Sequence, residues 1–343
     1  MKLRPEEETN NFTLLRLLLA LMVVFGHFKL LSGTDYPHFP FNLADAAVDA
    51  FFVVSGYLIA GSYERTRGIW PFYIRRFFRL YPMYGCIVVL QAAIMLCLLP
   101  GGPFSEPAAT IHYLAANLLF ANFLQYDIGN VLAPLHNPGI NPSLWTLKIE
   151  IGFYLIVPLV YAATRRLGWW VLLAIFFGSV AYELVAQHLG DDRLAKQLPG
   201  QMQFFVVGMA LYMYGDKLKA PTWVSLIVTV LFLAAWTWLS PIPAGICPLI
   251  VGVFVFCFAL CTPVLRMRTD MSYSVYLVHG PLIQTALLLG LFHDTLPFFA
   301  IVVCSVLLLA YVAELLVERP GNEFGRRLSR RIAQRTPAVP RIA

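Results

Sequence analysis

One apolar stretch near the amino terminus holds two ionisable residues that could do chemistry inside a membrane. Arg16 and His27 lie eleven residues apart. In a helix this spacing corresponds to about 16 Å and about three turns, so both side chains share one face. A charged group within a bilayer costs several kcal/mol unless it is paired or solvated. Pairing between helices and a working site both meet that need, and a converging set of such residues favours the site.

Two aspartates open the next apolar run, one helical turn apart. These aspartates are Asp45 and Asp49. The short connection 33–45 predicts that this run is the antiparallel neighbour of the first, which puts Asp49 at the depth of His27. An aspartate that accepts a hydrogen bond from one imidazole nitrogen fixes the tautomer and raises the basicity of the other nitrogen. A general base that deprotonates a hydroxyl needs this arrangement. A purely structural His–Asp pair would give the same pattern.

Further polar residues interrupt later runs. Glu150 lies about two turns below the outer end of the run 143–164, and we expect it in the layer of His27. Tyr276 and His279 are three residues apart and share a helix face. A histidine just before Gly-Pro also commonly caps backbone groups that the proline frees, so a site and a structural role both stay open.

Two short motifs concern phosphate binding and helix packing. Arg75, Arg76 and Arg79 begin a run on its cytoplasmic side. Guanidinium groups match phosphate oxygens bidentately, so this cluster could hold a nucleotide-type cofactor. Anionic lipid headgroups attract the same charges, and by charge alone the lipid interpretation is the stronger. Elsewhere, Ser55-Gly56 allows a close helix approach or a kink.

The elements that must position these residues are membrane helices. Of the 343 residues, 59% are hydrophobic and 13% are charged, whereas a soluble domain has about 25% charged residues. The chain is therefore predicted to be all-α, a polytopic membrane helix bundle. A spanning helix needs about 20 mainly apolar residues. Such runs fall near 12–32, 46–63, 77–99, 143–164, 168–188, 200–215, 222–239, 245–262, 271–292 and 296–317, with a shorter one at 111–125.

The positions of lysine and arginine predict the orientation, because positive residues stay on the cytoplasmic side. With ten crossings and a cytoplasmic amino terminus, the outer loops hold only Lys29, Arg193 and Lys196. The cytoplasmic segments then hold Arg65, Arg67, Arg75, Arg76, Arg79, Arg165, Arg166, Lys217, Lys219, Arg266, Arg268 and the tail 319–341.

A crossing at 111–125 would put these clusters on alternating sides. We therefore expect about ten transmembrane helices, a re-entrant or half-buried segment at 111–125, and both termini in the cytoplasm. The net charge of +6 is then a topology signal and gives little support to nucleic-acid binding.

The cysteines give no sign of a metal or disulfide protein, and the first apolar run does not resemble a cleaved signal peptide. All six cysteines lie in apolar runs, without metal-ligand spacing or a disulfide framework. We expect them to be small packing residues and expect no metal site. The first run is long and lacks a small-x-small cleavage site, so it is predicted to be an uncleaved helix.

Five segments together resemble the acyltransferase-3 family of integral membrane O-acyltransferases. They are Arg16 with His27, then 48–58, 75–82, 141–154 and 272–281, in the order of that family. Two departures are visible: Ala50 follows Asp49 where a larger apolar residue is usual, and Ile151 follows Glu150 where a second acidic residue is frequent. Neither removes a residue with an assigned role.

The resemblance implies transfer of an acyl group, usually acetyl, from cytoplasmic acyl-CoA to a hydroxyl of a carbohydrate or glycolipid acceptor. We accordingly expect one membrane-embedded acyltransferase domain over 1–320 and a basic cytoplasmic tail over 321–343. The expected location is a bacterial-type inner membrane. The expected partners are the acyl-CoA donor, the acceptor and membrane lipid.

The resemblance also assigns roles. His27, held by Asp49, would take the proton of the acceptor hydroxyl, Arg16 would orient the thioester or offset charge on its oxyanion, and Glu150 would position the acceptor or tune His27. Donor binding would fall to Arg75, Arg76, Arg79, Tyr276 and His279. Direct transfer and a covalent acyl-His27 route both fit.

Two other classes of membrane protein remain as alternatives. A transporter or permease for a small solute or lipid-linked sugar also carries intramembrane charges and broken helices. Against it, the hydropathy shows no repeated halves. A receptor-like sensory domain would need a signalling segment, and none is evident.

Overall fold

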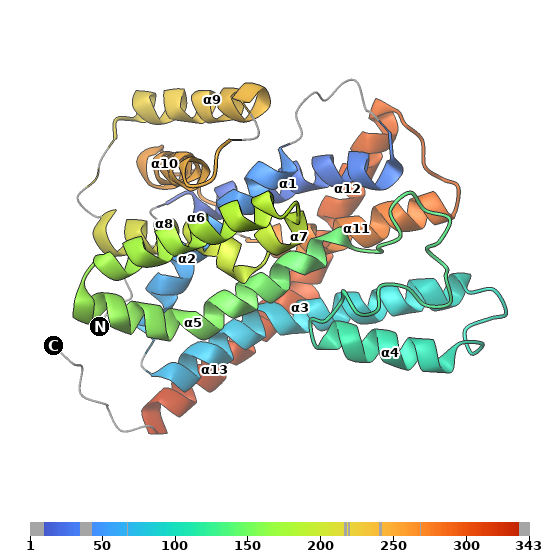
Figure 1. The fold of residues 1–343 in the computed structure, drawn as a ribbon. Coiled ribbons are helices and arrows are strands. Elements are labelled where there is room, and N and C mark those ends of the chain that lie inside the picture. Colours follow the sequence, from blue (N-terminus) through green and yellow to red (C-terminus); the bar gives the residue numbers. More distant parts are fainter. Residues whose placement is uncertain are drawn as a thin grey trace.

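The computed structural model describes residues 10–34, 43–66, 68–215, 218, 220–239, 242–267 and 269–335. Within these ranges the chain forms helices and no strand, as the all-α prediction required. Figure 1 shows the arrangement. The helices are α1 (Phe12–Ser32), α2 (Ala44–Arg65), α3 (Ile69–Leu98), α4 (Pro107–Leu118), η2 (Pro142–Leu144), α5 (Trp145–Leu167), α6 (Trp170–His188), α7 (Asp192–Ala195), α8 (Leu198–Tyr214), α9 (Thr222–Leu239), α10 (Ile246–Cys261), α11 (Ser272–Leu288), α12 (Leu296–Ala313), η4 (Glu314–Glu318) and α13 (Arg319–Arg335).

Each apolar run predicted to cross the membrane coincides with one helix in the described part of the chain. Among the described residues, six helices are long and apolar enough to span a bilayer: α1, α2, α3, α5 with η2, α6, and the continuous helix that begins with α12. The other four, α8 to α11, have 16 to 18 residues, near the lower limit for a spanning helix. These features support a multi-pass helical membrane protein, while crossings beyond the six remain a prediction.

Helices α2 and α8 approach backbone to backbone. The carbonyl of Phe205 lies directly against Gly56, and the carbonyl of Val53 lies directly against Gly208, so a β-carbon at either glycine would overlap a backbone oxygen. Small residues favour helix association in membranes because they allow this closeness. Of the two possibilities at Ser55-Gly56, a close helix approach or a kink, the structure shows the close approach.

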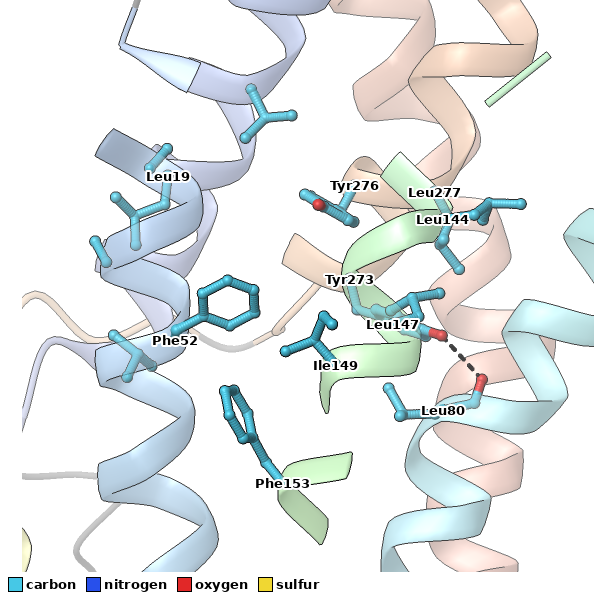
Figure 2. Packing of buried hydrophobic residues seen from close by; sticks show 14 of the residues in the cluster. Leu19, Phe52, Leu80, Leu144, Leu147, Ile149, Phe153, Tyr273, Tyr276 and Leu277 are labelled. Atoms are coloured by element: carbon cyan, nitrogen blue, oxygen red, sulfur yellow. Dashed lines mark hydrogen bonds between the residues drawn. The ribbon is translucent and has the colours of Figure 1, made fainter. Parts of the chain in front are cut away.

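Aromatic side chains connect the helices around this pair. Figure 2 shows Phe52 of α2 and Phe153 of α5, whose ring centroids are 5.4 Å apart at a nearly perpendicular angle. Phe153 also stacks on Phe205 of α8. In the same view, the Tyr273 hydroxyl donates a hydrogen bond of 3.0 Å to the carbonyl of Leu80, which connects α11 to α3. The helices that bear polar residues are thus held by a packed core.

The segment 111–125, expected to be half-buried, overlaps the second part of α4, which ends at Leu118. With its 12 residues, α4 reaches about 18 Å, too short to cross a bilayer. It packs along the second half of α3 (Figure 1), where the Tyr113 hydroxyl donates to Gln91 Oε1 at 2.9 Å and Phe120 stacks on Tyr84. Packing against protein is therefore as expected, and entry of this segment into the membrane stays a prediction.

The tail predicted over 321–343 is largely helix α13, which continues from α12 through a π-helical turn and lies along the first half of α3 (Figure 1). It is therefore packed on the bundle. Residues 336–343 of the tail lie outside the described residues, as do Arg67, Lys217, Lys219 and Arg268 of the predicted cytoplasmic segments.

Candidate active site

Two histidines from helices far apart in the sequence meet in the structure. His27 Nδ1 of α1 lies 2.7 Å from His279 Nε2 of α11. His279 is fully buried, whereas His27 is half-buried. The Ser143 hydroxyl lies 3.5 Å from the same His27 nitrogen and 3.4 Å from the same His279 nitrogen. The accessible imidazole therefore has a buried one behind it.

The surrounding acceptors fix the tautomers of this pair. His279 Nδ1 lies 3.0 Å from the carbonyl oxygen of Val275, which can only accept, so Nδ1 must carry the hydrogen. Two neutral imidazoles are expected, because adjacent positive charges repel. The unprotonated Nε2 of His279 then accepts from His27 Nδ1–H. This arrangement leaves the lone pair of His27 on Nε2, away from His279.

A proline in α11 explains how the segment before α5 is held. Pro281 has no N–H to donate to the carbonyl four residues earlier. That carbonyl, of Leu277, instead accepts from Asn141 Nδ2 at 2.9 Å. Asn141 Oδ1 accepts from the backbone N–H of Ser143 at 3.1 Å. The freed carbonyl thus anchors the residue that positions Ser143 beside the histidines.

The expected hydrogen bond between Asp49 and His27 is not present, and this prediction is wrong. Among the described residues, the hydrogen-bond contact of Asp49 is with Cys247 of α10, whose Sγ lies 3.8 Å from the carboxylate. Asp49 also experiences the charges of Asp45 and Lys196. The two side chains face different helices, because His27 of α1 points toward α11 while Asp49 of α2 points toward α10.

An ion-pair network of half-buried side chains around the buried Glu318 joins four helical elements. Arg16 of α1 and Arg79 of α3 both donate to Oδ2 of Asp270, which precedes α11. Arg79 also pairs with Glu318, whose side chain is 1% exposed and which accepts a further hydrogen bond from Ser274. Burial alone would raise the pKa of the Asp270 carboxyl, but Arg16 and Arg79 lower that pKa to about 2.

The three arginines expected to bind the donor lie in different surroundings. Arg79 is held by two carboxylates. The Arg76 guanidinium lies over the rings of Phe72 and Tyr154, and its buried Nε has no hydrogen-bond partner among the described residues. Arg75 Nη1 donates to the neutral Thr66 hydroxyl at 3.2 Å. Arg75 and Arg76 are thus the members of this cluster that no carboxylate holds in the described part of the chain.

A polar stripe on one face of η2 and α5 lies between the histidines and the arginines. Its members are Ser143, Thr146, Glu150 and Tyr154, at spacings of three, four and four residues, which place them on one helix face. The Thr146 and Tyr276 hydroxyls lie 2.9 Å apart, and the Tyr154 hydroxyl donates to Glu150.

The stripe places Glu150 between the histidines and the arginines. Glu150 lies seven residues, about 10 Å along the helix, from Ser143, and its electrostatic neighbours include Arg76, Arg79 and Tyr276. Its depth in the membrane relative to His27 stays a prediction.

Sequence reasoning missed Asn141, Ser143, Asp270 and Glu318 as functional candidates. The spacing of polar residues down α5 was a signal for Ser143. The Pro281 kink was a signal that some side chain must satisfy a free carbonyl. Asp270 and Glu318 gave no comparable signal, because acidic residues beside arginine-rich loops are ordinary.

Comparison with known proteins gives this geometry its context. The acyltransferase-3 family model, described as an acyltransferase domain, matches residues 9–315. A protein of Shigella phage Sf6 named O-acetyl transferase is 26% identical over 331 residues, covering 91% of this chain and 96% of the relative. Nodulation protein 10 of Rhizobium leguminosarum bv. viciae is 25% identical over 315 residues, covering 82% of this chain and 84% of the relative. No solved structure matches the chain.

The family model and the helices agree on one class of protein. The matched span begins just before α1 and ends within the π-helical turn after α12. It therefore contains both histidines, the ion pairs of Arg16 and Arg79 with Asp270, and the polar stripe, while Glu318 lies just beyond it. On this evidence, the chain belongs to the acyltransferase-3 family and is a membrane acyltransferase.

Proposed function

We propose that the enzyme moves an acyl group, with acetyl as our first choice, from cytoplasmic acyl-CoA to a hydroxyl of a carbohydrate or glycolipid acceptor. The His27–His279 pair carries this proposal. It gives the half-buried His27 a defined unprotonated Nε2, which a general base needs to accept the proton of an attacking hydroxyl. The name of the phage relative, O-acetyl transferase, supports an acetyl group and an oxygen acceptor.

In this proposal the proton moves from the acceptor hydroxyl to His27 Nε2 while the oxygen attacks the thioester carbonyl carbon. The carbon–sulfur bond then breaks, and CoA leaves as the thiol by taking that proton back from His27 Nε2, which restores the base. His279 keeps His27 in the required tautomer, as the partner of a catalytic imidazole does in hydrolases. A route through an acyl group on His27 Nε2 uses the same lone pair.

The residues present also fit an anionic donor. The buried Nε of Arg76 has no partner among the described residues, and Arg75 donates only to a neutral hydroxyl. The α5 stripe supplies polar groups between this end and the histidines. This order supports a donor whose phosphates stay near the arginines while its acyl end reaches toward His27.

The charge distribution supports the proposed orientation in an inner membrane, with both termini cytoplasmic. The side chains of α13 lie against α3 beside Arg75, so the basic tail and the first basic loop lie on one side of the bundle. Positive residues are typical of the cytoplasmic side.

Reconstituted protein tests the activity directly. Protein in phosphatidylcholine nanodiscs would be incubated with acetyl-CoA labelled in its acetyl group and with an envelope glycan extract from cells that lack the gene. We expect CoA thiol release and labelled glycan, and the same from the His188→Ala control, because His188 is exposed at the end of α6. Solute uptake into liposomes without any acyl transfer would instead support a permease.

A further inference from the structure

The docking of α13 on α3 fixes which arginines of the tail lie beside Arg75. The β-carbon of Phe78 lies directly against Gly325, where a side chain would overlap it. One turn further along α13, the Ser329 hydroxyl donates to the carbonyl of Pro71 at 2.9 Å. The two helices are therefore antiparallel and in one register, and Arg75 lies between these contacts.

Two arginines of α13 lie at this register and gather positive charge around Arg75. Arg326 and Arg330 are one turn apart, directly follow the two contact residues, and are exposed. The charges with the largest effects on Arg75 are all arginines: Arg65, Arg76, Arg326 and Arg330. Like charges this close repel each other, so the cluster favours an anion among them.

Nearby carboxylates do not neutralise the centre of this cluster. Glu323 of α13 pairs with Arg319 at 3.4 Å and with Arg327 at 3.6 Å. Glu64 accepts hydrogen bonds from the hydroxyls of Tyr161 and Tyr212. Among the residues that the structure describes, no carboxylate lies within ion-pair distance of Arg75, Arg326 or Arg330.

We propose that Arg75, Arg326 and Arg330 form a binding site for a phosphate monoester, which in the proposed function is the 3′-phosphate of acyl-CoA. The proposal moves terminal phosphate recognition away from Arg79, which two carboxylates already hold, and it makes α13 part of the donor site. Three guanidinium groups suit a dianion with three terminal oxygens, because arginine binds phosphate bidentately. A phospholipid headgroup offers related chemistry, with a single negative charge on a phosphodiester.

Acetyl-dephospho-CoA, which lacks only the 3′-phosphate, separates these sources without any substitution. With protein in phosphatidylcholine nanodiscs, we expect acetyl-CoA to bind at least about tenfold more tightly than acetyl-dephospho-CoA, as for hydrogen bonds to a charged group. In the double variant Arg326→Gln with Arg330→Gln, this preference should largely disappear. The matched control, Arg327→Gln with Arg331→Gln, removes the same charge from the same helix and should keep the preference.

The outcomes separate this site from the proposed function on which it rests. Equal binding of the two donors by the unchanged protein, with transfer from both, would overturn the 3′-phosphate site and leave the acyltransferase proposal standing. The Arg326/Arg330 substitutions could instead leave the preference for acetyl-CoA unchanged and weaken only the binding of the protein to phosphatidylglycerol. That result would overturn the 3′-phosphate site in favour of a lipid headgroup site. Absence of binding and transfer with either donor would instead count against the proposed acyl-CoA donor.

Discussion

At the scale of single residues, the proposed chemistry depends on which nitrogen of His27 carries the hydrogen. The carbonyl of Val275 decides this through His279. Sequence reasoning identified both histidines, because ionisable residues are rare in apolar runs. It paired His27 with Asp49 because the two share a depth, but residues at one depth meet only if their helices turn the same faces to each other.

In the proposed mechanism His279 is a positioning residue, so its removal should change the catalytic behaviour of His27. We expect His279→Ala to lower kcat by about 10²-fold or more, to leave KM for acetyl-CoA nearly unchanged, and to shift the pH dependence of kcat. His279→Gln should recover part of the rate, because its amide oxygen can accept from His27 Nδ1–H. An unchanged pH profile together with a wild-type kcat would show that His279 only packs.

Asp270 should make stability depend on pH in the acidic range. Its pKa is held at about 2 in the folded protein, below the ordinary value of about 3.9. Its contribution to stability is therefore complete above about pH 4 and is lost as the pH falls toward 2. Thermal unfolding of detergent-solubilised protein should fall more steeply over this range than that of Asp270→Asn. Equal slopes would contradict the ion-pair assignment.

At the scale of helices, the sequence predicted where each element lies but not which face it presents. Long apolar runs are enough to locate helices, since only a helix satisfies its backbone in lipid. A helix that is apolar all round carries no pattern to indicate which helix it packs against. The contacts of α1 with α11 and of α2 with α10 could therefore not be predicted from the sequence. The α5 stripe was readable, because polar residues mark one face of that helix.

A glycine in the contact between α2 and α8 and a glycine outside it should respond differently to substitution by alanine. Gly56→Ala should destabilise the protein by about 1–3 kcal/mol, because a β-carbon overlaps the Phe205 carbonyl. Gly178→Ala in α6 meets open space and should be neutral or stabilising by up to about 1 kcal/mol. Thermal melting of both purified variants tests this, and a Gly56→Ala protein as stable as Gly178→Ala would refute the close packing.

At the scale of the whole molecule, two polar centres lie in one bundle: the ion pairs of Arg16 and Arg79 with Asp270, and the histidine pair. The sequence predicted the separation of Arg16 from His27, because eleven residues of helix impose it. The sequence could not predict that α13 packs beside the arginines of α3, because a basic tail has the composition of any cytoplasmic segment. Tertiary packing on α3 determines that part.

The predicted orientation can be tested by labelling introduced cysteines. After the native cysteines are replaced, a cysteine at Arg165 should react with a membrane-impermeant thiol reagent in inverted vesicles and not in intact cells. A cysteine at Asp192, in the opposite connection, should show the reverse. Labelling of the Arg165 position from outside would contradict the ten-crossing topology.

The most direct measurement of the central claim is single-turnover acetyl transfer by His27→Ala. The variant should be folded and should bind acetyl-CoA as the unchanged protein does, because the arginines lie at the other end of the polar stripe. We predict that its transfer of labelled acetyl to the envelope glycan extract is abolished, while His188→Ala transfers normally. Near-normal transfer by His27→Ala would contradict the assignment of His27 as the residue that performs the chemistry.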